Sequence, residues 1–230
     1  MKKLFYIFIT LSFFIALLVW LMPSQKAEQA KIENSLLKKH TNRSRFPSQK
    51  TSLTLTDSEI QERIQESNTR RKFIKLDENK LHKGILEKEM FHSSDAETVA
   101  KFNPMELTEE QKNDGRIFLS NDLYTLEGKK VGDSIELNVP EYGLKREATI
   151  TKIDVDPKDD IVSWSGYLVG GDTNKEGFHI TQTVKDNFTI GTINSDDKTY
   201  SMLIKNGYGW INDVANESAA ILAGESDHDH

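Results

Sequence analysis

The chain has 230 residues, no cysteine and a formal net charge of −6, from 30 basic and 36 acidic side chains. The lack of cysteine excludes a disulfide scaffold and leaves the redox compartment open. Residues 131–230 hold 18 acidic and only 8 basic side chains, so this part is repelled by nucleic acid and by anionic lipid, and we expect neither as its ligand.

The first predicted element is a membrane-spanning helix over residues 4–22. This segment carries no charge, follows Lys2 and Lys3, and ends at Pro23. A helix of this length crosses a hydrocarbon core of about 30 Å. A cleaved signal peptide would have a shorter apolar core followed by small residues, which are missing here. We therefore expect residues 1–22 to be an uncleaved signal anchor, with a short cytoplasmic N-terminus, although the flanking charges do not settle its orientation.

Residues 23–130 form a charged segment whose apolar residues are thinly spaced. It contains 20 basic and 18 acidic side chains, a balance that opposes collapse into a core of its own. Short helices are nevertheless indicated, because Thr56 and Glu59 form a capping-box pattern ahead of Ile60 and Ile64. The segment is either a solvated spacer or an extended arm that wraps another protein and becomes ordered on binding. Its residues expected to contact a partner are Phe73, Leu81, Ile85, Met90 and Phe91.

Residues 131–214 alternate between apolar and polar side chains, with turn residues about every ten positions. This pattern predicts seven antiparallel strands, arranged as a small sandwich or a partly open barrel. A change of phase between Ile150 and Ile153 indicates a bulge or strong bend. Trp164 falls on the core face of its strand, whereas Tyr142 and Tyr167 lie on or near the opposite face and are expected to contact a partner.

Several short motifs in these strands resemble a known family. They are Trp164-Ser165-Gly166, Gly191-Thr192-Ile193, Tyr200, Tyr208 and Trp210. They are similar to the β-module in the propeptides of bacterial secreted zinc metalloendopeptidases. Together with the predicted anchor and charged arm, the chain resembles the membrane-anchored chaperones that accompany a metalloendopeptidase through type II secretion.

The resemblance implies a single-pass protein of the bacterial inner membrane with most of its chain in the periplasm. It implies binding of one secreted metalloendopeptidase as a 1:1 heterodimer, with no catalytic residue, no cofactor and no resident metal. Two other functions stay open: a membrane-tethered, propeptide-like protease inhibitor, and a structural subunit of an envelope secretion complex.

The residues themselves also predict a protein that is not an enzyme. Ser163 and Ser165 lack the glycine frame of a nucleophile elbow, and His179 stands alone on its strand. Residues 215–230 are expected to be an acidic tail. A weaker hypothesis is that His228 or His230 in this tail binds the open coordination position of a client's zinc ion.

Overall fold

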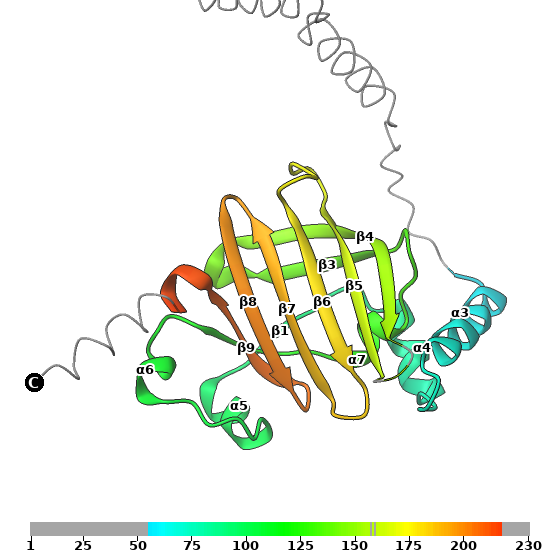
Figure 1. The fold of residues 1–230 in the computed structure, drawn as a ribbon, viewed down its shortest axis with the longest axis horizontal. Helices are drawn as coiled ribbons and strands as arrows, with labels where there is room; N and C mark the ends of the chain where they lie inside the picture. The colour runs from blue at the N-terminus through cyan, green and yellow to red at the C-terminus, as the bar shows by residue number, and fades with distance from the viewer. Residues whose placement is uncertain (1–54, 157, 159, 218–230) are drawn as a thin grey trace, which may run out of the picture. The chain divides into compact units, whose positions relative to one another are not determined.

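Nine strands form one sheet in the computed structural model, which describes residues 55–156, 158 and 160–217 (Figure 1). The strands follow the order β1-β2-β9-β8-β7-β6-β5-β4-β3, with every neighbouring pair antiparallel. Their bounds are β1 His92–Ser93, β2 Ile117–Ser120, β3 Ser134–Val139, β4 Leu144–Asp156, β5 Ile161–Leu168, β6 Gly177–Thr183, β7 Phe188–Ser195, β8 Lys198–Lys205 and β9 Tyr208–Asp213.

The seven predicted strands correspond to β3 through β9. The apolar positions of β3, β5, β6 and β8 are buried, as the alternation predicted. On β7, however, Phe188 is only half-buried and Ile190 is exposed, and β9 is buried along almost its whole length.

The register of β4 against β5 shifts between Ile150 and Lys152, which confirms the predicted bulge. Opposite this bulge a Cβ atom on Gly166 would lie 1.9 Å from the carbonyl oxygen of Thr149, so only glycine fits there. Asn206 and Gly207 both have positive φ, as expected for the tight turn that joins β8 to β9.

Short segments ahead of β3 bring the two edges of the sheet together. The amide of Met90 donates to the carbonyl of Glu136 on β3 at 2.9 Å, and the amide of Glu136 donates to the carbonyl of Lys88 at 2.8 Å. These bonds form a parallel bridge just before β1, at the opposite end of the strand order from β3. The sheet therefore rolls into a nearly closed barrel, which is the barrel alternative of the sequence-based prediction.

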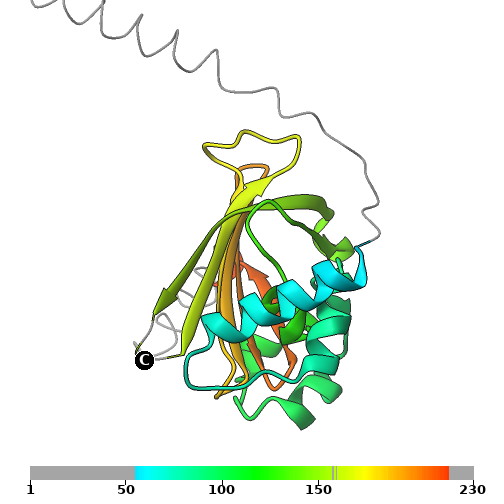
Figure 2. The same cartoon turned by 90° about the vertical axis from the view of Figure 1, so that its right-hand side faces the viewer.

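Six short helices accompany the strands within the described residues. They are α3 Asp57–Arg70, α4 Glu78–Leu86, α5 Ala96–Phe102, α6 Glu109–Lys112, α7 Leu123–Glu127 and the 3-10 helix η1 Pro140–Tyr142. Figure 2 shows α3 running across one side of the rolled sheet. The predicted capping box is present at its start, where Thr56 accepts from the amide of Glu59 and Glu59 accepts from the amide of Thr56.

Residues 55–130 differ from the predicted arm, because they pack on the strands of their own chain. Met90, Phe91, Leu119 and Leu126 lie in the same hydrophobic core as Trp164, although all four precede the predicted domain boundary at residue 131. A second cluster joins the helices and consists of Ile60, Ile64, Leu76, Leu81 and Ile85. Among the described residues, the helices and the barrel therefore belong to one compact unit.

Part of the sequence-based prediction lies outside the described residues. The predicted anchor at residues 4–22, the first part of the arm at residues 23–54, and the tail histidines His228 and His230 belong to this group. Within the part of the chain that the structure does describe, no helix is long and apolar enough to cross a membrane.

Candidate functional site

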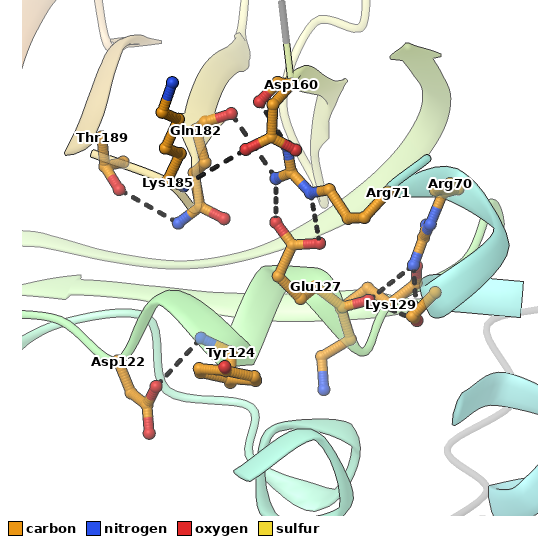
Figure 3. Close-up of polar contacts among 11 residues, drawn as sticks. Arg70, Arg71, Asp122, Tyr124, Glu127, Lys129, Asp160, Gln182, Lys185 and Thr189 are labelled. Carbon is orange, nitrogen blue, oxygen red and sulfur yellow. Dashed lines mark hydrogen bonds and ion pairs between the residues drawn. The ribbon is translucent and has the colours of Figure 1, made fainter. Parts of the chain in front are cut away.

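A cluster of buried charges holds the N-terminal helices against the barrel (Figure 3). The guanidinium of Arg71, directly after α3, forms a two-point ion pair with the carboxylate of Glu127 on α7, and both side chains are fully buried. Arg71 also donates to the carbonyl of Asp160 at 2.6 Å, next to the start of β5. Burial raises the pKa of Glu127, and the charge of Arg71 opposes that shift. One arginine therefore joins three separate elements.

Further charges extend this cluster along α3 and α4. Arg63 pairs with Asp133 through both terminal guanidinium nitrogens. Arg70 donates to the carbonyls of Lys129 at 2.7 Å and Glu127 at 2.5 Å. The Lys129 ammonium donates to three carbonyls at the end of α4, and burial lowers the pKa of Lys129 to about 8. These charged groups point at partners in the same chain, so the cluster acts as a clamp between helices and barrel.

The barrel interior is filled by side chains. Barrels of about eight strands, close to the size of this one, have room inside either for their own side chains or for one small ligand. Here the inward positions are occupied by large residues that are almost completely buried, with Trp164 at 0% exposure. They include Ile150, Trp164, Phe178, Ile180, Ile193, Tyr200 and Met202. The interior is thus a core, and binding is left to the outer surface.

The outer surface carries apolar side chains in register across four neighbouring strands. Phe118 on β2 pairs with Trp210 on β9, Trp210 pairs with Leu203 on β8, and Leu203 pairs with Ile190 on β7. Ile190 is 43% exposed, while Trp210 is buried beneath Arg116, whose guanidinium lies 5.1 Å from the ring centroid.

A second outer row lies beside the first. Tyr208 on β9 pairs with Lys205 on β8, which pairs with Phe188 on β7. The ring of Phe102, from the end of α5, stacks on Tyr208 with centroids 4.7 Å apart. The two rows hold positions two apart on β7, β8 and β9, and such positions face the same side of a sheet, so the rows form one surface. We call it the outer apolar patch; it consists of Phe102, Phe118, Phe188, Ile190, Leu203, Tyr208 and Trp210.

The residues predicted to contact a partner lie elsewhere. Leu81 and Ile85 are buried in the helix cluster, and Met90 and Phe91 are buried in the barrel core. In this conformation these four side chains are not available to another protein. Phe73 is 67% exposed and is available.

The two predicted tyrosines are both half-buried. The ring of Tyr142 packs 5.1 Å from that of Tyr200, and its hydroxyl lies 2.7 Å from the carbonyl oxygen of Gly115. Tyr167 is on the outward side of β5 and pairs with Thr149 and Gly177. The structure brings neither of them onto the outer apolar patch, so their contact with a partner stays a prediction.

The outer face also contains a serine–histidine contact. Ser165 Oγ lies 2.8 Å from Nδ1 of His179 on the neighbouring strand, and Nε2 of His179 lies 3.4 Å from the hydroxyl of Thr181. The hydrogen bonds of His179 in the described part of the chain thus reach two hydroxyls and no carboxylate. Within that part, no group of three or more acidic, histidine or cysteine side chains could hold a metal ion.

Comparisons with known proteins concern the barrel. A family model described as the BamI lipocalin-like domain matches residues 87–218. The match starts at the segment that closes the barrel and leaves α3 and α4 outside. A solved structure described as "Structure of a chaperone-substrate complex" is 29% identical, with 57% of this chain and 93% of that chain covered and a TM-score of 0.45. No curated protein matches the chain.

Proposed function

Because the chain belongs to the BamI lipocalin-like domain family, we propose that its barrel is the protein-binding part of a membrane-tethered chaperone. The observation that carries this proposal is the outer apolar patch on a barrel whose interior is filled. A filled barrel has no room for a lipocalin-type ligand. Contiguous apolar groups on an outer surface, especially aromatic ones, are typical of sites that bind other proteins.

The proposed client is a secreted zinc metalloendopeptidase that leaves the cell by type II secretion. Support comes from the motif resemblance around Trp164, Gly166 and Gly191, and from the apolar segment at residues 4–22. In this proposal that segment holds the protein in the inner membrane with its barrel in the periplasm. A chaperone that binds only the folded client stabilises it by about 2.7 kcal/mol at a hundredfold excess over the dissociation constant.

The packing of residues 55–130 changes how the client would be held. Encirclement by a long arm would require these residues to be free for the client. Since α3 and α4 are clamped to the barrel by Arg71, Glu127 and Lys129, we place the main client contact on the outer face of the barrel. Client binding then requires little new ordering of this part of the chain, which reduces the entropic cost of binding.

Gene deletion in the source organism tests the proposal. A chaperone predicts loss of active extracellular metalloendopeptidase, restored by the full-length chain supplied in trans. Normal extracellular activity together with premature activity inside the cell would instead support a tethered inhibitor. Affinity purification of the full-length chain that yields membrane subunits and no secreted enzyme would support a structural subunit. Unchanged protease activity in every compartment would overturn the proposed function.

A further inference from the structure

We propose that the outer apolar patch binds a segment of a client protein in which apolar side chains stand next to carboxylates. This inference rests on the proposed function and specifies where the client binds and by what chemistry. Cations that border the patch determine which chemistry it can bind.

Two lysines sit at the aromatic rings of the patch. The Nζ atom of Lys101 lies 5.3 Å from the ring centroid of Phe102, and that of Lys205 lies 5.7 Å from the centroid of Phe188. Contacts of this kind attract a cation to the face of a ring and hold it there. The positive charges are therefore fixed at the margin of an apolar surface, where a carboxylate of a bound segment would meet them.

These two lysines are not neutralised by acidic side chains of the described chain. Neither Lys101 nor Lys205 takes part in a salt bridge with any described carboxylate, although Lys205 donates to the main-chain carbonyl of Asp186. Arg116, the third cation at the patch, differs because it is paired with Asp114 at 2.6 Å. The charge available to a partner is thus that of the two lysines.

The dimensions of the patch suit a short segment. The row from Phe118 to Ile190 crosses three strand-to-strand steps, each about 4.8 Å, and so extends over roughly 14 Å. An extended segment of about four residues covers this distance, at roughly 3.4 Å per residue. Alternate side chains of such a segment face the patch, so apolar ones can contact Leu203 and Ile190. Carboxylates that flank these apolar residues on the same face can reach the lysines.

Two other occupants fit less well. A second copy of the chain, packed face to face, would gather four lysine ammonium groups, two from each copy, in one interface without supplying carboxylates from the patch. A bilayer with anionic lipids would meet the wider surface of a region with 18 acidic and 8 basic residues, which repels it. A short client segment meets only the local lysines, because charges beyond about 8 Å are largely screened at physiological ionic strength.

Photo-crosslinking from the full-length chain tests the inference. Benzoylphenylalanine is placed at Ile190 in the patch and, as a matched control, at Val169, which is similarly exposed but lies outside it. We expect the Ile190 position to crosslink to the secreted client in intact cells, and the Val169 position to give none of this product. The crosslinked client peptide, mapped by mass spectrometry, should contain apolar residues together with Asp or Glu.

Charge reversal then tests the chemistry with the identified client. We expect K101E and K205E together to weaken its binding to the full-length chain at least tenfold at low salt, and less at high salt. The matched control K145E on the exposed side of β4 changes the charge in the same direction but lies outside the patch, and should change binding less than twofold. Urea unfolding confirms that the variants remain folded.

Each other outcome identifies which proposal fails. Crosslinks from Ile190 to lipid, to a second copy or to residues 218–230 would assign the patch to that occupant and overturn the inference. Equal losses from the double variant K101E/K205E and from K145E would overturn the role of the two lysines. If the client crosslinks elsewhere and gene deletion still abolishes its secretion, the proposed function stands while the patch is excluded. Unchanged secretion after deletion removes the function itself.

Discussion

The helical layer and the barrel are stabilised in different ways within one compact unit. The barrel core is built from apolar residues supplied by every strand from β2 to β9. The helical layer has only five buried apolar residues in its own cluster, and it is joined to the barrel by buried arginine, lysine and carboxylate groups. A segment rich in charge can therefore fold when its charges are paired across elements.

Buried ion pairs and apolar packing contribute differently to stability. Apolar burial stabilises in proportion to the area removed from water, at about 25 cal/mol per Å². A buried ion pair recovers little more than the cost of desolvating its two charges, but removing one partner leaves the other uncompensated. The clamp at Arg71 should thus fix where the helices sit while adding little net stability. Four measurements test this contrast.

The largest effect is expected in the barrel. Replacing Trp164, which is fully buried, with alanine should lower the free energy of unfolding by about 3–5 kcal/mol, measured by urea denaturation. Trp164→Phe should cost clearly less, because the indole Nε1 has no hydrogen-bond partner among the described residues and the ring is partly replaced. Equal losses from both variants would contradict a role based on packing volume.

The clamp should respond in a non-additive way. Arg71→Met leaves the buried Glu127 carboxylate without its main cation and should cost about 3 kcal/mol. The double variant Arg71→Met with Glu127→Leu should be more stable than Arg71→Met alone, since no unpaired charge remains between them. A double-mutant cycle in denaturant measures the difference. If the double variant loses the full sum of the single losses, the two groups have no favourable coupling and the clamp is contradicted.

The titration of Lys129 should appear in the pH dependence of stability. Its pKa is lowered to about 8 in the folded protein, whereas in the unfolded chain it has its ordinary, higher value. Between these values the unfolded state binds more protons, so the contribution of this group to stability rises with pH. The free energy of unfolding of the wild type, compared with that of Lys129→Met, should rise by about 1 kcal/mol per pH unit between pH 8 and 10. A difference that is flat over this window would show that the ammonium is not titrating there.

The smallest effect is expected at the capping box of α3. Thr56→Ala removes the side chain that accepts from the amide of Glu59 and should cost about 1 kcal/mol. Thr56→Ser keeps the hydroxyl and serves as the matched control. Hydrogen exchange should show increased opening of α3 and little change in the barrel strands. Equal opening of both regions would mean that helix and barrel unfold as one unit.

Much of the barrel could be predicted from the sequence because its signals are local. Alternation places Trp164 and Ile180 inward whatever the neighbouring strand is, and the bulge after Ile150 appears as a change of phase within one strand. The strand β2 was missed, since its four residues lie inside a charged segment. Its place beside β9 depends on a contact between residues about 90 positions apart, such as Phe118 with Trp210.

The candidate site could not be predicted for the same reason. Alternation indicates Phe188 and Ile190 as the apolar positions of one strand and Tyr208 and Trp210 as those of another, but it does not show which side of the sheet they face. They form a patch only through the register that pairs them. The residues predicted to contact a partner show the reverse case. Leu81, Ile85, Met90 and Phe91 form an apolar stripe in the sequence. In the structure the chain's own helices and strands cover this stripe.

Residues close together in the chain specify the strands from β3 to β9, the bulge, the tight turns and the helix caps, so these elements can be predicted from the sequence. That the charged residues 55–130 complete the barrel is visible only in the folded chain, through pairs such as Arg71 with Glu127 and Met90 with Glu136. Burying a single charged side chain is costly, because it loses its hydration. An oppositely charged partner offsets most of this cost, and that partner is identified only in the folded chain.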